Sequence, residues 1–168
     1  MIAPAAVRLG PLRLDLIDTY VSWDNDPEIM RGHGRVQPVD REERLAGLHA
    51  QLAGDNAHFT VYDSDDTPVG TITLGVDHAV RAAEFSIALG PEGRGRRLAA
   101  PATRAAADHA FDELALRNVL LTVLEPNIAA LRAYQRAGFR TVGTRRDSGL
   151  WDGEVCNEII MDMIPTDR

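Results

Sequence analysis

The chain has 168 residues, of which 45% are hydrophobic and 26% charged, a composition that suffices for one compact domain with a substantial core. Its net charge of −7 and pI of about 5.2 argue against broad binding to nucleic-acid phosphates, which needs a clustered basic surface. The single cysteine, Cys156, excludes an internal disulfide framework and cysteine-based metal clusters. The sequence shows no charged-then-apolar leader and no apolar run near the ~20 residues of a membrane span, so we expect a cytoplasmic protein without a membrane partner.

The first third of the chain predicts a strand with an interruption at Gly10-Pro11, two helices and a single turn between them. Asp40 and Glu43 have the spacing of a capping box, which starts the second helix. The expected ranges are 7–16 for the strand, 17–23 and 40–54 for the helices, and 28–31 for the turn.

The rest of the chain predicts a hairpin, a strand, a long helix, a buried strand, a second helix and a closing hairpin around Trp151-Asp152-Gly153. The strand after the long helix should return parallel to the strand before it. The expected ranges are 58–62, 69–76, 83–89, 118–124, 140–144 and 155–163 for the strands and 98–114 and 128–137 for the helices. In the third of these strands, side chains alternate, so that Glu84, Ser86 and Ala88 face away from Phe85, Ile87 and Leu89.

A basic glycine loop, Gly90 to Arg97, joins that strand to the long helix. The first turn of a helix leaves N–H groups without partners and carries partial positive charge, so it can hold an anion. Arg94, Arg96 and Arg97 add full charges there. The alternative is an ordinary connection with solvated arginines.

The second helix of this region carries clear end signals. Asn127 is expected to be its N-cap, and Gly138 its left-handed stop, with Phe139 packing back on the helix. Leu131 and Tyr134 share one helix face with Asn127, which places Tyr134 roughly 10 Å along the axis from the cap.

These two segments together resemble the GCN5-related N-acetyltransferases (GNAT). The family signature Arg/Gln-x-x-Gly-x-Gly/Ala corresponds to Arg94-Gly95-Arg96-Arg97-Leu98-Ala99, with Arg97 in the usual glycine position. The downstream signature corresponds to Asn127, Ala130, Tyr134, Gly138 and Phe139. The resemblance extends over most of the chain. Within the family, the chain is similar to the ribosomal-protein-alanine, spermidine and aminoglycoside 6′-type branches. It implies one N-acetyltransferase domain over residues 1–168.

The resemblance implies an α/β GNAT fold, with a mixed central sheet of about seven strands, a splayed parallel pair and flanking helices. It implies acetyl-CoA as co-substrate and no metal. Tyr134 would be the general acid toward the thiolate. Acetyl-CoA is expected to contact three regions. These are the loop amides of Arg94, Gly95, Arg96, Arg97, Leu98 and Ala99, the backbone of Ile87, Ala88 and Leu89 in the preceding strand, and Asn127 and Ala130 at the start of the second helix.

The roles of several residues stay open at this stage. Glu84 would orient the amine or accept its proton, or be a solvated strand carboxylate. Trp23 and Trp151 would wall the acceptor pocket or pack in the core, and the five histidines are expected at surface or packing positions. We expect helical dihedrals at Arg97, because the long helix is just beginning there; the alternative is a positive φ, which would mark a degraded phosphate site.

The expected activity is transfer of an acetyl group from acetyl-CoA to a primary amine by direct attack in a ternary complex. A small molecule or a peptide N-terminus remains open as acceptor, as do the acyl group and homodimer formation. The segment Gly32-His33-Gly34-Arg35 lacks the acidic residues of the spermidine branch, which argues against polyamine specificity. The alternative function is a nonenzymatic acyl-CoA-binding regulatory domain.

Overall fold

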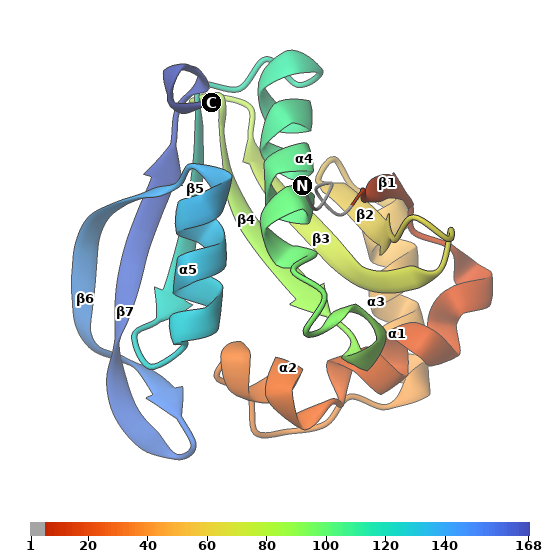
Figure 1. Cartoon of the computed structure of the whole chain (residues 1–168). Helices are drawn as coiled ribbons and strands as arrows, with labels where there is room; N and C mark the ends of the chain where they lie inside the picture. Colours follow the sequence, from red (N-terminus) through yellow and green to blue (C-terminus); the bar gives the residue numbers. More distant parts are fainter. Residues whose placement is uncertain (1–5) are drawn as a thin grey trace.

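A computed structural model describes residues 6–168, which form a seven-stranded sheet with helices on both faces (Figure 1). The strand order is β1-β2-β3-β4-β5-β7-β6. All neighbours are antiparallel except β4 and β5, which are parallel. The strands are β1 (Arg8–Pro11), β2 (Ala57–Tyr62), β3 (Pro68–Asp77), β4 (Ala82–Leu89), β5 (Asn118–Leu124), β6 (Arg140–Trp151) and β7 (Glu154–Met163).

Five α-helices cover the sheet in the described part of the chain. Figure 1 shows α4 and α5 in front of the sheet, α3 behind it, and α2 beneath the lower ends of β4 and β5. The helices are α1 (Ile17–Asp24), α2 (Pro27–Gly32), α3 (Arg41–Ala53), α4 (Ala99–Asp112) and α5 (Ile128–Ala137). Within residues 6–168, no helix has the length and hydropathy that a membrane span needs.

The two faces of the sheet are covered by two separate hydrophobic clusters. The alanine face of α4, including Ala102 and Ala106, packs with Phe85 in the larger cluster. Ala88 instead packs against the smaller cluster, which includes Tyr20 of α1 and Leu48 of α3. The alternation predicted for β4 is therefore confirmed, because neighbouring residues of this strand contact different layers.

The parallel pair opens along its length. β4 pairs with β5 only over Ala82–Glu84 and Asn118–Leu120. Beyond this point β4 stays paired with β3 as far as Leu89, and β5 stays paired with β7 as far as Leu124. The two strands thus separate toward their carboxyl ends, which confirms the expected splay and leaves an opening in the sheet.

Two predicted element boundaries are wrong. The first strand ends at Pro11, because the Arg13 N–H donates to the Tyr20 hydroxyl at 3.1 Å instead of to a neighbouring strand, and residues 14–16 form a 3₁₀ turn. In the last hairpin, β6 continues to Trp151, well past residue 144. Its turn uses two residues with positive φ, Asp152 at 51° and Gly153 at 80°, which suits a two-residue hairpin connection.

Candidate active site

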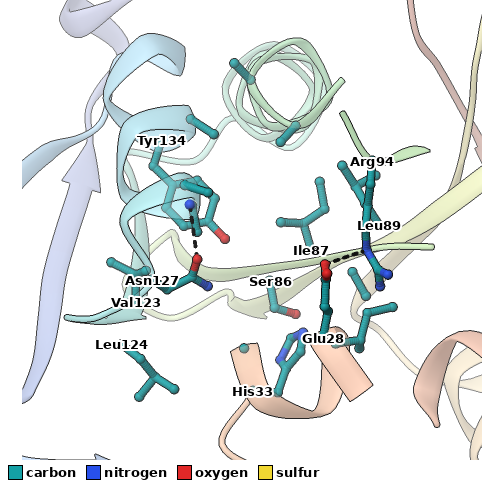
Figure 2. Close-up of a pocket in the computed structure, with 18 of the residues that line it drawn as sticks. Glu28, His33, Ser86, Ile87, Leu89, Arg94, Val123, Leu124, Asn127 and Tyr134 are labelled. Atoms are coloured by element: carbon teal, nitrogen blue, oxygen red, sulfur yellow. Dashed lines mark hydrogen bonds and ion pairs between the residues drawn. The ribbon is translucent and has the colours of Figure 1, made fainter. Parts of the chain in front are cut away.

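The opening between β4 and β5 leads into a cavity of about 630 Å³. Figure 2 shows side chains reaching it from α2, β4, β5 and α5. Arg96 does not line this cavity. All the other predicted site residues do: Glu84, Ile87, Ala88, Leu89, Arg94, Gly95, Arg97, Leu98, Ala99, Asn127, Ala130 and Tyr134.

The N-terminus of α4 faces this cavity without a side-chain cap. Its N-cap residue is Leu98, whose side chain forms no capping hydrogen bond. Pro101 lies in the first turn, where its missing N–H removes no helical hydrogen bond. The remaining N–H groups of this turn are available to an anion, and the helix dipole favours negative charge there.

Two of the three loop arginines are occupied by carboxylates. Arg94 binds Asp26, and it also contacts Glu28 at 3.1 Å. Arg96 binds Asp63 at 2.7 Å. These guanidinium groups hold the pKa values of Asp26 and Asp63 below the usual range of a carboxyl.

Arg97 therefore provides the guanidinium that is free for a ligand in this loop, since no carboxylate within residues 6–168 lies at ion-pair distance from it. Its side chain is exposed and lines the cavity. The expected helical dihedrals are wrong, because Arg97 has φ of 59°, the alternative that would mark a degraded phosphate site; the guanidinium nevertheless still lines the cavity. The next residue, Leu98, returns to the right-handed region and is buried in the larger cluster, so the chain turns sharply at Arg97 to insert it.

Both ends of α5 are formed as predicted. The Asn127 side chain accepts from the Ala130 N–H at 3.3 Å (Figure 2), and Gly138 has φ of 110°. The Phe139 N–H donates to the Tyr134 carbonyl at 3.0 Å, which closes the last turn. The Asn127 amide is thereby fixed at the cavity wall.

Aromatic neighbours hold the Tyr134 ring. Phe85 meets it edge-on with 6.1 Å between ring centroids, and Phe139 lies at 6.4 Å. Burial raises the pKa of Tyr134 to about 12. The hydroxyl therefore keeps its proton at neutral and alkaline pH and can donate to an atom in the cavity.

The two tryptophans have different positions. Trp23 is buried in the smaller cluster, and its indole N–H donates to Glu92 at 3.0 Å, so it is a core residue. Trp151 lines the cavity, with the Arg31 guanidinium 4.6 Å from the centroid of its ring. Arg31 belongs to α2, so this contact lies between α2 and the end of β6.

A second cavity of about 520 Å³ lies on the opposite face of β4 from α4. Its floor is formed by cross-strand neighbours, Thr73 beside Ser86 and Thr71 beside Ala88. The walls come from α1, α3 and the segment after α2. Five residues line both cavities, Ile29, His33, Ser86, Ile87 and Ala88, so the two cavities meet at β4.

His33 lines both cavities, and the sequence interpretation gave it no role in the site. It was expected at a surface or packing position and is exposed, but its ring also lies beside Ser86 and Ile87 at the cavities (Figure 2). Gly34, with φ of 65°, was the available signal, because a left-handed glycine ends α2 and fixes the residue before it. In the described part of the chain, no group of three or more histidine, cysteine, aspartate or glutamate residues could hold a metal ion.

Comparisons with known proteins agree with this arrangement. Residues 7–140 match the family described as "Acetyltransferase (GNAT) domain". The chain is 28% identical to the spermidine N(1)-acetyltransferase of Escherichia coli K12 over 158 residues, 93% of this chain and 84% of that protein. It is 30% identical to the Vibrio cholerae spermidine N(1)-acetyltransferase over 106 residues, 61% of each chain.

The fold is similar to that of a Vibrio cholerae spermidine N-acetyltransferase whose structure contains CoA and spermine. The TM-score is 0.88 at 23% identity, and the alignment covers 96% of both chains. The family match includes strands β1 to β5, the loop before α4, and helix α5 with Tyr134. The chain thus belongs to the GNAT acetyltransferases.

Proposed function

We propose that this protein transfers the acetyl group of acetyl-CoA to a primary amine, of a small molecule or a peptide N-terminus, by direct attack in a ternary complex. The observation that carries the proposal is the meeting of two cavities at the opening beside β4. Donor and acceptor can then approach the same point from opposite faces of the sheet. This arrangement suits direct transfer, because both reactants are held together before the bond forms.

The donor side has groups that fit acetyl-CoA. The uncapped first turn of α4 and the Arg97 guanidinium suit a pyrophosphate. The β5-facing backbone groups of residues 85–89 have no strand partner, because β5 has already separated. Backbone groups at such an edge need hydrogen-bond partners, which the amides of a pantetheine arm can supply. We propose that Ile87, Ala88 and Leu89 bind this arm.

The second cavity is our proposed acceptor site. The relatives named above act on spermidine by name. In this cavity, however, Asp24 and Glu43 are balanced by Arg35 and Arg44, and Asp24 is bound to Arg44 at 2.7 Å. A polyamine carries several positive charges and favours an excess of carboxylates. We therefore propose an acceptor with a single amine at the reacting end rather than a polyamine.

The proposed chemistry assigns separate tasks to two side chains. The Tyr134 hydroxyl would donate to the sulfur as the carbon–sulfur bond breaks. Because a thiol titrates near 8.5, the thiolate is a tolerable leaving group, and this donation should contribute only roughly 10²-fold. Glu84 lies on the cavity wall where β4 and β5 still pair, and we propose that it orients the amine electrostatically.

We further propose that residues 1–168 work as one N-acetyltransferase domain in the cytoplasm and without a metal. The continuous sheet, which includes strands from both ends of the described chain, supports a single domain. Homodimer formation stays a prediction.

Acetyl-CoA binding tests the donor site directly. At about 100 times its dissociation constant, acetyl-CoA should stabilise the fold by roughly 2.7 kcal/mol, which raises the unfolding midpoint by several degrees. Isothermal titration calorimetry gives the dissociation constant independently. If millimolar acetyl-CoA produces neither heat nor a midpoint shift, the proposed donor site is wrong.

A further inference from the structure

His33 is held rigidly at the end of α2. The Gly34 N–H donates to the Arg31 carbonyl at 3.1 Å, and the Arg35 N–H donates to the Met30 carbonyl at 2.8 Å. With Gly34 at φ of 65°, these two bonds form a Schellman stop. The Arg35 guanidinium also donates to the Asp24 carbonyl at the end of α1. The backbone that carries the imidazole is therefore fixed on both sides.

The imidazole lies where the two cavities meet. Of the five residues that line both of them, His33 is the one whose side chain titrates near neutral pH. Figure 2 shows its ring directed toward Ser86, while Tyr134 reaches the same cavity from α5. An amine that enters through the second cavity must pass beside this ring to reach an acyl group in the first.

The surroundings of the ring favour its uncharged form. His33 is exposed to solvent, yet protein atoms beside the ring partly desolvate it, and this desolvation is the largest cause that lowers the pKa of His33 below 6.5. Arg35 lowers the pKa further, whereas the Ile87 backbone and Asp24 act in the opposite direction. The other charged groups on the cavity walls are Glu28 and Arg31 of α2, Glu43 and Arg44 of α3, Glu84 of β4, Arg94 and Arg97 of the loop before α4, Arg136 of α5, and Glu158 of β7.

We infer that His33 is the catalytic base of the reaction and accepts the proton of the attacking amine. This inference rests on the proposed function. The amine nitrogen forms a bond to the acetyl carbon, and the bond between that carbon and sulfur breaks. The amine proton passes to a ring nitrogen of His33, and the thiolate takes a proton through Tyr134. Solvent then exchanges protons with both side chains, so the products are the acetylated amine and a free thiol.

The position of Glu84 makes it a poorer base for this step. Glu84 lies opposite Leu120 in the paired section of β4 and β5, at the closed end of the opening. It lines only the first of the two cavities. His33 lies beside Ser86 and Ile87, where the strands have already separated and both cavities are open.

A weak base of this kind suits an α-amine better than a lysine-like amine. An α-amine with a pKa near 7.8 is already uncharged in roughly one molecule in seven at pH 7, whereas an amine with a pKa near 10.4 is uncharged in only about one in 2,500. His33 then needs to take the proton only as the new bond forms. The test should therefore use an acceptor with a free α-amine.

The experiment compares His33→Ala and His33→Gln with the wild-type chain, measuring kcat and kcat/KM against pH with and without added imidazole. His78→Gln is the matched control, because His78 is exposed in the turn after β3 and lines neither cavity. We expect kcat of His33→Ala to fall by roughly 10²-fold or more, with loss of the acidic limb of the kcat/KM profile. Added imidazole should restore part of this rate.

The possible results separate cleanly. If His33→Ala keeps the wild-type rate and acidic limb, the inference is overturned while the proposed function stands. The inference is also overturned if both His33 variants unfold at the wild-type midpoint and bind acetyl-CoA normally, but imidazole restores no activity to His33→Ala. If the wild-type chain binds acetyl-CoA yet releases no thiol with any amine, the proposed function fails and the inference fails with it.

Discussion

Arg94 and Asp26 join the loop before α4 to the first turn of α2. The Asp26 carboxylate is the N-cap of α2 and accepts from the N–H groups of Glu28 and Ile29, while it also binds the Arg94 guanidinium. Both side chains are largely buried, with 27% and 14% of their surface exposed. The proposed phosphate loop is thus tied to the helix whose C-cap is His33.

Asp26→Asn and Asp26→Ala should differ in stability. Asparagine is as good an N-cap as aspartate, so Asp26→Asn removes only the charge of the Arg94 pair. Asp26→Ala also removes the cap, and we expect it to lower the free energy of unfolding by about 1 kcal/mol more than Asp26→Asn. Urea unfolding of the two variants checks this difference. Equal stabilities would show that capping of α2 by residue 26 contributes nothing.

The Asp26 carboxylate should also make the free energy of unfolding depend on pH in the acidic range. Arg94 and the two backbone N–H groups lower the pKa of Asp26 in the folded state. Its contribution to stability is therefore complete above the unfolded pKa of about 3.9 and is lost as the pH falls through the lower folded value. Wild-type unfolding measured from about pH 5 downward should show this loss, and Asp26→Asn should show a shallower one. Identical slopes would contradict the assignment to Asp26.

The variants Arg97→Gly and Arg97→Ala separate the effect of backbone strain at this position on stability from the effect of the guanidinium charge on acetyl-CoA binding. A left-handed φ costs an L-residue roughly 1–2 kcal/mol, so Arg97→Gly should stabilise the ligand-free chain by about that amount, whereas Arg97→Ala keeps the strain. Both variants lose the guanidinium, and both should bind acetyl-CoA roughly tenfold more weakly. Thermal unfolding and calorimetry measure the two effects. Tighter binding by Arg97→Gly would exclude the phosphate contact.

Tyr134→Phe should lower kcat by on the order of 10²-fold and leave acetyl-CoA affinity nearly unchanged, because only the hydroxyl is removed. Since burial raises the pKa of Tyr134 to about 12, the rate should not fall through loss of this proton at neutral or moderately alkaline pH. The measurement is single-turnover acetyl transfer, which isolates the chemical step. An unchanged rate would remove Tyr134 from the mechanism.

Glu84→Gln tests positioning against proton transfer at this residue. If Glu84 only orients the amine, its loss should reduce kcat/KM by a similar factor at about pH 7 and about pH 9. Activity that recovers toward pH 9, where more of the amine is uncharged, would instead assign proton acceptance to Glu84. Glu92→Gln is a suitable control of equal chemistry, because Glu92 binds Trp23 and lies outside both cavities.

Local signals allowed much of this structure to be predicted from the sequence. Asn127 and Gly138 set the ends of α5 through bonds within a few residues, so their patterns identify the helix and place Tyr134. The alternation along β4 is equally local. The turn at Arg97 was missed because its φ is set by the burial of Leu98 against strands that are distant in the sequence. The residues next to Arg97 give no signal of this packing.

The partners of the charged side chains could not be predicted either. Arg94 binds Asp26 across 68 positions of sequence, and Arg96 binds Asp63 across 33. Such pairs depend on how α2 and the β2–β3 turn dock beside the loop. His33 was missed for the same reason, since its place at both cavities follows from the packing of α2 under β4 rather than from any nearby motif.

Thiol release from acetyl-CoA in the presence of a panel of amines tests the central claim most directly. The panel should contain peptides with free α-amines, amino acids, aminoglycoside-like amines and spermidine, with product mass measured for each. We predict acetyl transfer to an α-amine acceptor, faster than to spermidine, and loss of most of this activity in Tyr134→Phe. A wild-type chain that binds acetyl-CoA but acetylates none of these amines would contradict the assignment of the two cavities as donor and acceptor sites.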